Sequence, residues 1–232
     1  MKTIIYNIGT LAGILPEGVL KLEGEEMKQV ECIEDAYLVI EDGVISEFGE
    51  ASGHCCTGDN PSHFAGPSPC GQGGSTVSGT TVSGSCEPKI EYIDAKGGFV
   101  LPCFCDSHTH IVYAGCRDGE FRDKIAGLSY EEIAARGGGI LNSADLLHNT
   151  SEDELYRQSM ERVNEIMAMG TGAVEIKSGY GLTVEDELKM LRVIRRIRET
   201  VPMLVRSNFL GAHAVGRAFK GRQSEYVDLV CN

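Results

Sequence analysis

The segment FVLPCFCDSHTH, which runs from Phe99 to His110, decides the fold. Its apolar run from Phe99 to Phe104 predicts a strand buried on both faces, and its polar residues gather at the C-terminal end. Strands of this kind occur in parallel sheets that helices cover on both sides. The segment therefore indicates a fold of the α/β class.

Downstream of this strand, the sequence alternates between helix and strand patterns. The expected helix starts are the capping boxes Ser129–Glu132 and Ser151–Glu154, and Thr183. The expected strands are residues 171–177 and 203–210. Such a series implies parallel strands joined by crossover helices, in a doubly wound sheet or a (β/α)8 barrel. A complete barrel takes about 250 residues, so a barrel in this chain would be partial.

The composition divides the chain into three parts. Residues 1–50 alternate apolar and polar positions and contain Asp42-Gly43, a strong hairpin turn pair, so they predict a small β region. Residues 51–89 are rich in Gly, Ser, Thr, Cys and Pro. They bury too little apolar surface to offset the entropy lost on ordering, which predicts a flexible insertion. Residues 90–232 hold the α/β series.

The net charge and the cysteine content limit the classes of binding partner and the cellular location that we expect. The 232 residues carry a formal net charge of −13, which repels phosphate backbones and anionic lipid, so neither nucleic acid nor a membrane is an expected partner. No apolar run approaches the roughly 20 residues that span a bilayer, and the N-terminus lacks a signal-peptide pattern. The nine cysteines show no regular C-x-x-C pairing, which favours reduced thiols in the cytoplasm.

Two histidines lie at the end of the first α/β strand. His108 and His110 stand two residues apart, so both imidazoles should point to one face, where a single metal ion could bind both. Catalytic groups gather at such strand ends in parallel α/β folds. Asp106 lies two residues before His108, so its side chain should point to the same face, where it could orient a ligand histidine. The alternatives are two solvated loop histidines and an Asp that forms a turn.

Three later residues are candidates for contact with a ligand. Tyr180 lies between two glycines in EIKSGYGL, a setting poorly suited to core packing. His213 follows the third strand in FLGAHA, with a purely structural histidine as the alternative. Arg117 could hold a carboxylate through two hydrogen bonds, or could be a surface charge. The glycines of RGGGI, residues 136–140, permit close approach of the backbone to a ligand or simply end a helix.

Taken together, several motifs resemble one family of enzymes. The motifs are DSHTH, AGCRDGEF, RGGGI, EIKSGYGL, ELKMLRV and FLGAHA. They resemble the imidazolonepropionases of the metal-dependent amidohydrolase superfamily, over residues 92–232 and more loosely over the first fifty. The pair HxH is shared by many hydrolases, but SGYGL and LGAHA at these separations are specific to few of them.

This resemblance implies a fold, a reaction and a set of residue roles. The fold would be a (β/α)8 barrel with a small N-terminal β-sandwich, of which this chain holds the first βα units. One zinc or iron ion, held by His108, His110 and a later His and Asp, would activate water. The water would open the ring of 4-imidazolone-5-propanoate to N-formimidoyl-L-glutamate, a step of histidine degradation. Arg117, Tyr180 and His213 match substrate-contacting positions, with Arg117 suited to the propanoate carboxylate, and a homodimer would be compatible with this family.

The chain departs from the family pattern in three ways. The segment 51–89 is longer than the expected connection, and Cys103 and Cys105 replace small or aliphatic residues, which their size and polarity allow. The remaining metal ligands and the proton-transfer residues are expected beyond Asn232, so we expect an incomplete active site in this chain alone. The alternatives are another metal hydrolase, of dihydroorotase, deaminase or TatD type, and a non-catalytic half-barrel. The acidic charge argues against a nuclease, and SGYG argues against all three hydrolases.

Overall fold

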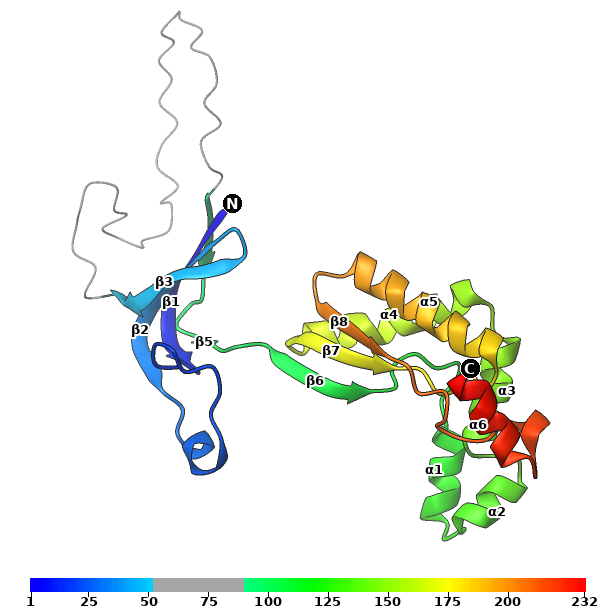
Figure 1. Ribbon diagram of the computed structural model, residues 1–232. Coiled ribbons are helices and arrows are strands. Elements are labelled where there is room, and N and C mark those ends of the chain that lie inside the picture. Colours follow the sequence, from blue (N-terminus) through cyan, green and yellow to red (C-terminus); the bar gives the residue numbers. More distant parts are fainter. Residues whose placement is uncertain (52–89) are drawn as a thin grey trace, which may run out of the picture. The chain divides into compact units, whose positions relative to one another are not determined.

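A computed structural model describes residues 1–51 and 90–232, so the insertion predicted at 51–89 lies, apart from its first residue, outside the described residues. The chain divides into two compact units, Met1–Pro102 and Cys103–Asn232, each with its own sheet (Figure 1). Within the described ranges, no helix combines the length and the apolar composition needed to cross a membrane.

The first unit is built around one mixed sheet, in which the strands follow the order β3-β2-β1-β4 and β5 lies beside β1. β2 pairs antiparallel with both β1 and β3, whereas β4 and β5 run parallel to β1. The elements are β1 (Lys2–Ala12), the short 3-10 helix η1 (Gly24–Lys28), β2 (Cys32–Glu41), β3 (Val44–Glu50), β4 (Ile90–Asp94) and β5 (Phe99–Val100). The described residues of this unit form a single sheet, so the second sheet of a β-sandwich stays a prediction.

The hairpin predicted at Asp42-Gly43 is confirmed. These two residues join β2 to β3, and both have a positive φ, of 50° at Asp42 and 84° at Gly43. A two-residue turn with positive φ at both positions matches the twist of the strands that it connects. The turn thereby sets the register in which Glu41 faces Val44.

The single strand predicted from Phe99 to Phe104 is wrong. Phe99 and Val100 form β5 beside β1, whereas Phe104 begins β6 in the sheet of the second unit. Pro102 lies between them, and because proline has no N–H to donate, it interrupts a strand ladder. The expected burial is wrong as well, since Phe99 and Phe104 are 74% and 63% exposed. In the described sheet β6 is an edge strand, with β7 on one side.

The second unit contains a parallel sheet in the order β6-β7-β8, which confirms the predicted α/β class. Its strands are β6 (Phe104–Thr109), β7 (Thr171–Lys177) and β8 (Leu204–Asn208). Its helices are α1 (Asp118–Ile125), α2 (Tyr130–Ala135), α3 (Ile140–Asn149), α4 (Glu152–Ala168), α5 (Val184–Thr200), the 3-10 helix η3 (Arg217–Phe219) and α6 (Gln223–Cys231). The connection from β6 to β7 runs through α1 to α4, and the connection from β7 to β8 runs through α5 (Figure 1).

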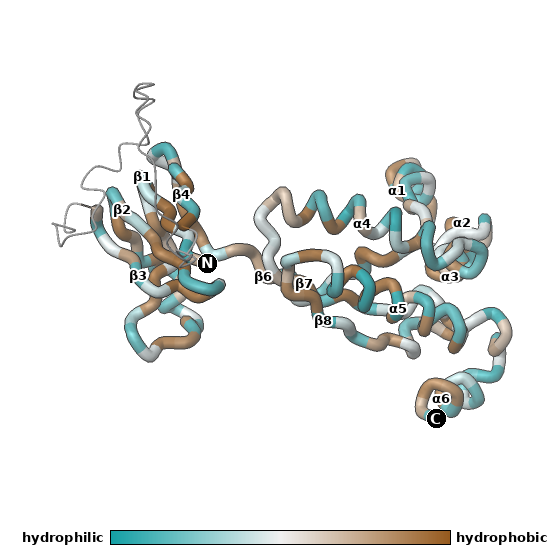
Figure 2. Tube along the Cα trace, turned by 90° about the horizontal axis from the view of Figure 1, so that it is seen from above, coloured by the Kyte–Doolittle hydropathy of each residue, from teal (hydrophilic) through white to brown (hydrophobic). Residues whose placement is uncertain are grey.

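Helices α4 and α5 pack their apolar sides into one core with this sheet. The spacing of three and four residues on α5 places one stripe in the core, formed by Met190, Val193, Ile194 and Ile197. The same cluster contains residues from α4, β7 and β8, namely Leu155, Val163, Val174, Ile176 and Val205. Figure 2 shows the corresponding mixture of polar and apolar positions along α4. This packing fixes the sheet and therefore the places where its strands end.

The helix starts predicted from the sequence are confirmed. Ser129 and Glu132 form both hydrogen bonds of a capping box, at 3.2 and 2.7 Å. The hydroxyl of Ser151 accepts a backbone hydrogen bond at the start of α4, and that of Thr183 does so at the start of α5. Each cap satisfies an N–H group that has no partner inside its helix.

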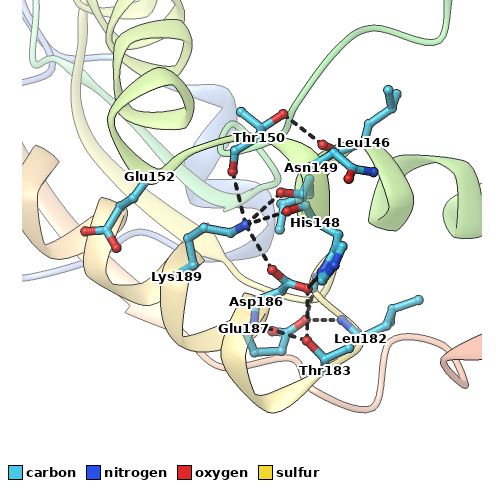
Figure 3. A network of polar contacts seen from close by, with 12 residues as sticks. Leu146, His148, Asn149, Thr150, Glu152, Leu182, Thr183, Asp186, Glu187 and Lys189 are labelled. Carbon is cyan, nitrogen blue, oxygen red and sulfur yellow. Dashed lines mark hydrogen bonds and ion pairs between the residues drawn. The ribbon is translucent and has the colours of Figure 1, made fainter. Parts of the chain in front are cut away.

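A lysine ties the C-terminus of α3 to the start of α5 (Figure 3). Lys189 Nζ donates to the backbone carbonyls of Leu147 and Thr150, at 2.8 and 3.1 Å. It also forms an ion pair of 2.9 Å with Asp186, whose other oxygen lies 2.8 Å from His148 Nδ1. The last carbonyls of a helix lack partners within it, so Lys189 acts as a cap for α3.

We expect Lys189→Met to lower the free energy of unfolding by about 3 kcal/mol, because it leaves the buried carboxylate of Asp186 without its ammonium partner. Arg195→Met is the matched control, since Arg195 is an exposed cation of the same helix. It should change stability by no more than about 0.5 kcal/mol. Urea unfolding compares the two variants with the parent, and equal losses would contradict the role of Lys189.

Asp186 should make the stability of this unit depend on pH. Burial raises the pKa of its carboxyl, but hydrogen bonds from Lys189, His148 and Thr183 outweigh it, so the pKa lies below the ordinary 3.8. A carboxyl with a depressed pKa stabilises the fold above its unfolded pKa and loses that contribution as the pH falls through the folded value. Asp186→Asn should therefore destabilise the protein at pH 7 and make less difference below about pH 3. Urea titrations across this pH range measure how the loss of stability in Asp186→Asn depends on pH. A loss that does not vary with pH would refute this expectation.

Candidate active site

Three parallel strands bring four ring-bearing side chains to one edge of the sheet. β6, β7 and β8 run in the same direction, so their C-terminal ends meet there. His108 and His110 lie at the end of β6, Tyr180 follows β7, and His213 follows β8. The ring centroids of His110 lie 5.0 Å from those of both Tyr180 and His213, and the pairs His108–His110 and Tyr180–His213 are 5.6 Å apart. The structure thus brings together four of the six residues that the sequence singled out, and Asp106 and Arg117 are not among them.

His110 lies in the middle of this cluster. Its Nδ1 is buried and has no hydrogen-bond partner among the described residues. Burial lowers the pKa of His110, and the nearby charges of His213, His108 and Lys177 lower it further, while Glu175 opposes them. The ring is therefore held neutral, which is the form of histidine that binds metals.

Asp106 shares β6 with His108 but forms a local contact. Its Oδ1 accepts a hydrogen bond of 3.2 Å from the backbone N–H of His108. An acidic side chain that bonds the backbone two residues on is typical of a turn former. This contact favours the turn-forming alternative over an orienting role toward an imidazole.

The loop that carries Tyr180 is shaped by a buried carboxylate. Glu187, in the first turn of α5, accepts hydrogen bonds from the backbone N–H groups of Gly179, Gly181 and Leu182, at 2.9, 2.7 and 3.0 Å. Three donors on one buried carboxylate satisfy its charge without a cationic partner. The backbone on both sides of Tyr180 is therefore held to α5.

The glycines beside Tyr180 are required by close contacts. Gly179 has a φ of 107°, and a Cβ there would lie 3.0 Å from Cβ of His213. A Cβ on Gly181 would lie 2.4 Å from the backbone nitrogen of Glu187. Real Cβ atoms essentially never approach a neighbour as closely as at Gly181, and at Gly179 the contact is tight and the φ is one that side chains rarely allow. The two glycines therefore allow the loop to lie against both neighbours.

A second tie joins this loop to the end of β8. The hydroxyl of Ser178 accepts a hydrogen bond of 3.0 Å from the backbone N–H of Leu210, and its own N–H donates to the carbonyl of Asn208. No role for Ser178 or Glu187 was predicted from the sequence. The sequence feature that could have indicated the role of Glu187 is its place in the first turn of a helix that follows a glycine-rich loop.

Arg117 lies outside the ring cluster, immediately before α1. Its Nε and Nη2 both donate to Oε2 of Glu120, at 2.8 and 2.5 Å. This hydrogen bond is the main reason that the pKa of Arg117 is raised. Burial raises the pKa of Tyr180, and the charge of Arg117 acts on it in the opposite direction, so the two side chains influence each other.

The described residues supply only part of the ligand set that a metal ion needs. They include no group of three or more His, Cys, Asp or Glu side chains that could hold a metal ion. A catalytic metal normally takes three protein ligands or more, so His108 and His110 amount to part of a set. These two still fit the task, because they lie two residues apart where β6 ends, and the neutral ring of His110 has a buried nitrogen without a partner among the described residues.

We expect Glu187→Gln to loosen the Tyr180 loop, because an amide oxygen cannot serve the three N–H donors that both carboxylate oxygens now share. Hydrogen exchange at Gly179, Gly181 and Leu182 should become roughly tenfold faster. Glu185→Gln is the matched control, since Glu185 is exposed in the same helical turn. Exchange that is unchanged in Glu187→Gln, or equally faster in both variants, would contradict this role.

Comparison with solved structures gives the class of fold. The chain matches E. coli guanine deaminase with a TM-score of 0.54, over 98% of this chain and 42% of that protein, at 12% sequence identity. A likeness at this identity shows the fold alone. The chain therefore shares the α/β fold of that protein.

The particular family follows from sequence relatives. The imidazolonepropionase of Christiangramia forsetii is 46% identical over 235 residues, covering all of this chain and 49% of the relative. That of Flavobacterium psychrophilum is 47% identical over 232 residues, with the same coverage, and that of Ectopseudomonas mendocina is 52% identical over 137 residues. No family model matches the chain. The chain belongs to the imidazolonepropionase family, spans about half the length of the relatives that match it throughout, and corresponds to their N-terminal half.

Proposed function

We propose that the extended protein, meaning this chain continued to the length of its curated relatives, hydrolyses 4-imidazolone-5-propanoate to N-formimidoyl-L-glutamate. One observation carries the proposal. In a chain of this family, His108, His110, Tyr180 and His213 meet at the C-terminal ends of three parallel strands. This is the edge where the active sites of barrel enzymes lie.

His108 and His110 would hold one zinc or iron ion, since imidazole ligands accept either metal. When bound, such an ion supplies a nucleophile by lowering the pKa of its water from 15.7 toward about 7. The low pKa of His110 keeps its ring ready to bind a metal without first losing a proton. The remaining ligands and the groups that move protons would come from the part of the extended protein that follows Asn232.

Arg117, Tyr180 and His213 would bind the substrate. Arg117 carries a permanent positive charge and can hold the propanoate carboxylate through two hydrogen bonds. Burial raises the pKa of Tyr180, so its hydroxyl keeps the proton that it can donate to the substrate ring. The rings of Tyr180 and His213 are inclined by only 27°, which suits contact with a planar heterocycle.

The fold assigned by resemblance supports the same function. The sequence placed the start of the barrel at residue 90, but β4 and β5 pair with β1 of the first unit. We therefore propose that residues 103–232 form the first part of a (β/α)8 barrel, that residues 1–50 contribute to a small β-sandwich, and that residues 51–89 are an insertion. The parallel order β6-β7-β8 with helical crossovers supports the barrel. The net charge of −13 favours a small-molecule substrate over nucleic acid, and the cysteine pattern favours the cytoplasm.

We expect the purified extended protein to contain about one metal ion per chain and to hydrolyse the imidazolone. His108→Ala and His110→Ala should each lose most of the metal and reduce kcat at least about 1000-fold, because each removes a ligand. His148→Gln is the control, since this histidine lies outside the cluster, and it should keep both metal and activity.

Metal analysis measures the metal content, and the loss of imidazolone absorbance measures hydrolysis, so the two expectations are tested separately. A protein that binds metal but leaves the imidazolone intact would refute the substrate. Full metal content in both histidine variants would refute the ligand assignment.

A further inference from the structure

Glu120 links two parts of the candidate site that are separate in the sequence. One of its oxygens, Oε2, accepts hydrogen bonds from Nε and Nη2 of Arg117. The other, Oε1, accepts a hydrogen bond of 2.9 Å from the backbone N–H of Gly139. The side chain of Glu120 is only 17% exposed, whereas that of Arg117 is 41% exposed. One carboxylate thus joins the start of α1 to the glycine run before α3.

The glycine run has the shape that this contact requires. Gly139 is buried and has a φ of 85°, which L-residues with side chains rarely adopt. A Cβ on Gly138 would lie 3.0 Å from the carboxyl carbon of Glu120 and 2.8 Å from a methyl group of Ile133. The glycines of RGGGI therefore leave space for the carboxylate of Glu120 and offer it a backbone N–H group, in addition to ending α2.

The contact also decides which part of Arg117 remains available. A guanidinium has five N–H donors, and Glu120 takes one from Nε and one from Nη2. Two of the three remaining donors lie along the edge formed by Nη1 and Nη2, which can bind a second carboxylate in a bidentate manner. Hydrogen bonding to Arg117 is also the main reason that the pKa of Glu120 is lowered, so the acid stays ionised and keeps this arrangement.

We propose that Glu120 is a positioning residue that fixes the guanidinium of Arg117, so that its Nη1–Nη2 edge receives the carboxylate of the substrate. Glu120 thereby gives the site its preference for an imidazolone that carries an acidic side chain. The proposal rests on the proposed function for its substrate, but the orientation of Arg117 is a property of this chain alone.

The kinetic test uses Glu120→Gln in the extended protein, with Asp118→Asn as the matched control. Asp118 is an exposed carboxylate in the same helical turn, so both variants lose one negative charge. Glu120→Gln should raise KM for imidazolone propanoate roughly tenfold and leave kcat within about twofold, as expected when binding of the substrate carboxylate is lost. The same ring with a neutral amide in place of the carboxylate should be hydrolysed equally by the parent and by both variants.

A double-mutant cycle separates positioning from a general structural effect. If Glu120 acts through Arg117, Glu120→Gln should change KM little when Arg117 is already Met. The proposal is overturned if the loss persists in Arg117→Met, or if Glu120→Gln impairs the acidic and the neutral substrate equally.

The orientation of Arg117 can also be measured without turnover. In nitrogen-15 spectra of the extended protein, the Nε–H signal of Arg117, assigned with Arg117→Lys, should exchange slowly in the parent and in Asp118→Asn. It should exchange rapidly in Glu120→Gln. If the parent hydrolyses no imidazolone, the proposed function fails, and this signal still decides the role of Glu120: equally slow exchange in Glu120→Gln overturns it.

Discussion

The parallel pairing of β6, β7 and β8 is the constraint on which the candidate site depends. Ala173 lies beside Cys105 of β6 and beside Leu204 of β8, so all three strands end at one edge. Helices α4 and α5 hold this register by packing apolar residues against the sheet. Without it, His108, Tyr180 and His213 would be far apart, because more than thirty residues separate each from the next along the chain.

Around this edge, buried carboxylates hold the loops in place. Glu187 gathers the N–H groups on either side of Tyr180, and Glu120 joins Arg117 to the glycine run. Farther from the site, the buried carboxylate of Asp186 pairs with Lys189 and lies 2.8 Å from His148 at the end of α3. Glu120 and Glu187 each lie in the first turn of a helix and bond the backbone of another segment, so the helices position the site as well as covering the sheet.

Local sequence patterns predicted the features that depend on local physics. The turn at Asp42-Gly43 and the cap at Ser151 follow from backbone preferences of single residues, and the parallel α/β order follows from apolar periodicity. The break at Pro102 was missed because the apolar run continues across it, although its two halves join different sheets. The roles of Glu120 and Glu187 were missed because their partners come from the folded loops, which periodicity does not describe.

The central claim is that this chain supplies two metal ligands from one strand end of an imidazolonepropionase. A crystal structure of the extended protein, with anomalous scattering collected at the zinc and iron edges, tests it most directly. The account predicts one metal peak, with nitrogen atoms of both His108 and His110 about 2.0–2.2 Å away. A metal bound by other residues, with either histidine turned away from it, would contradict the account.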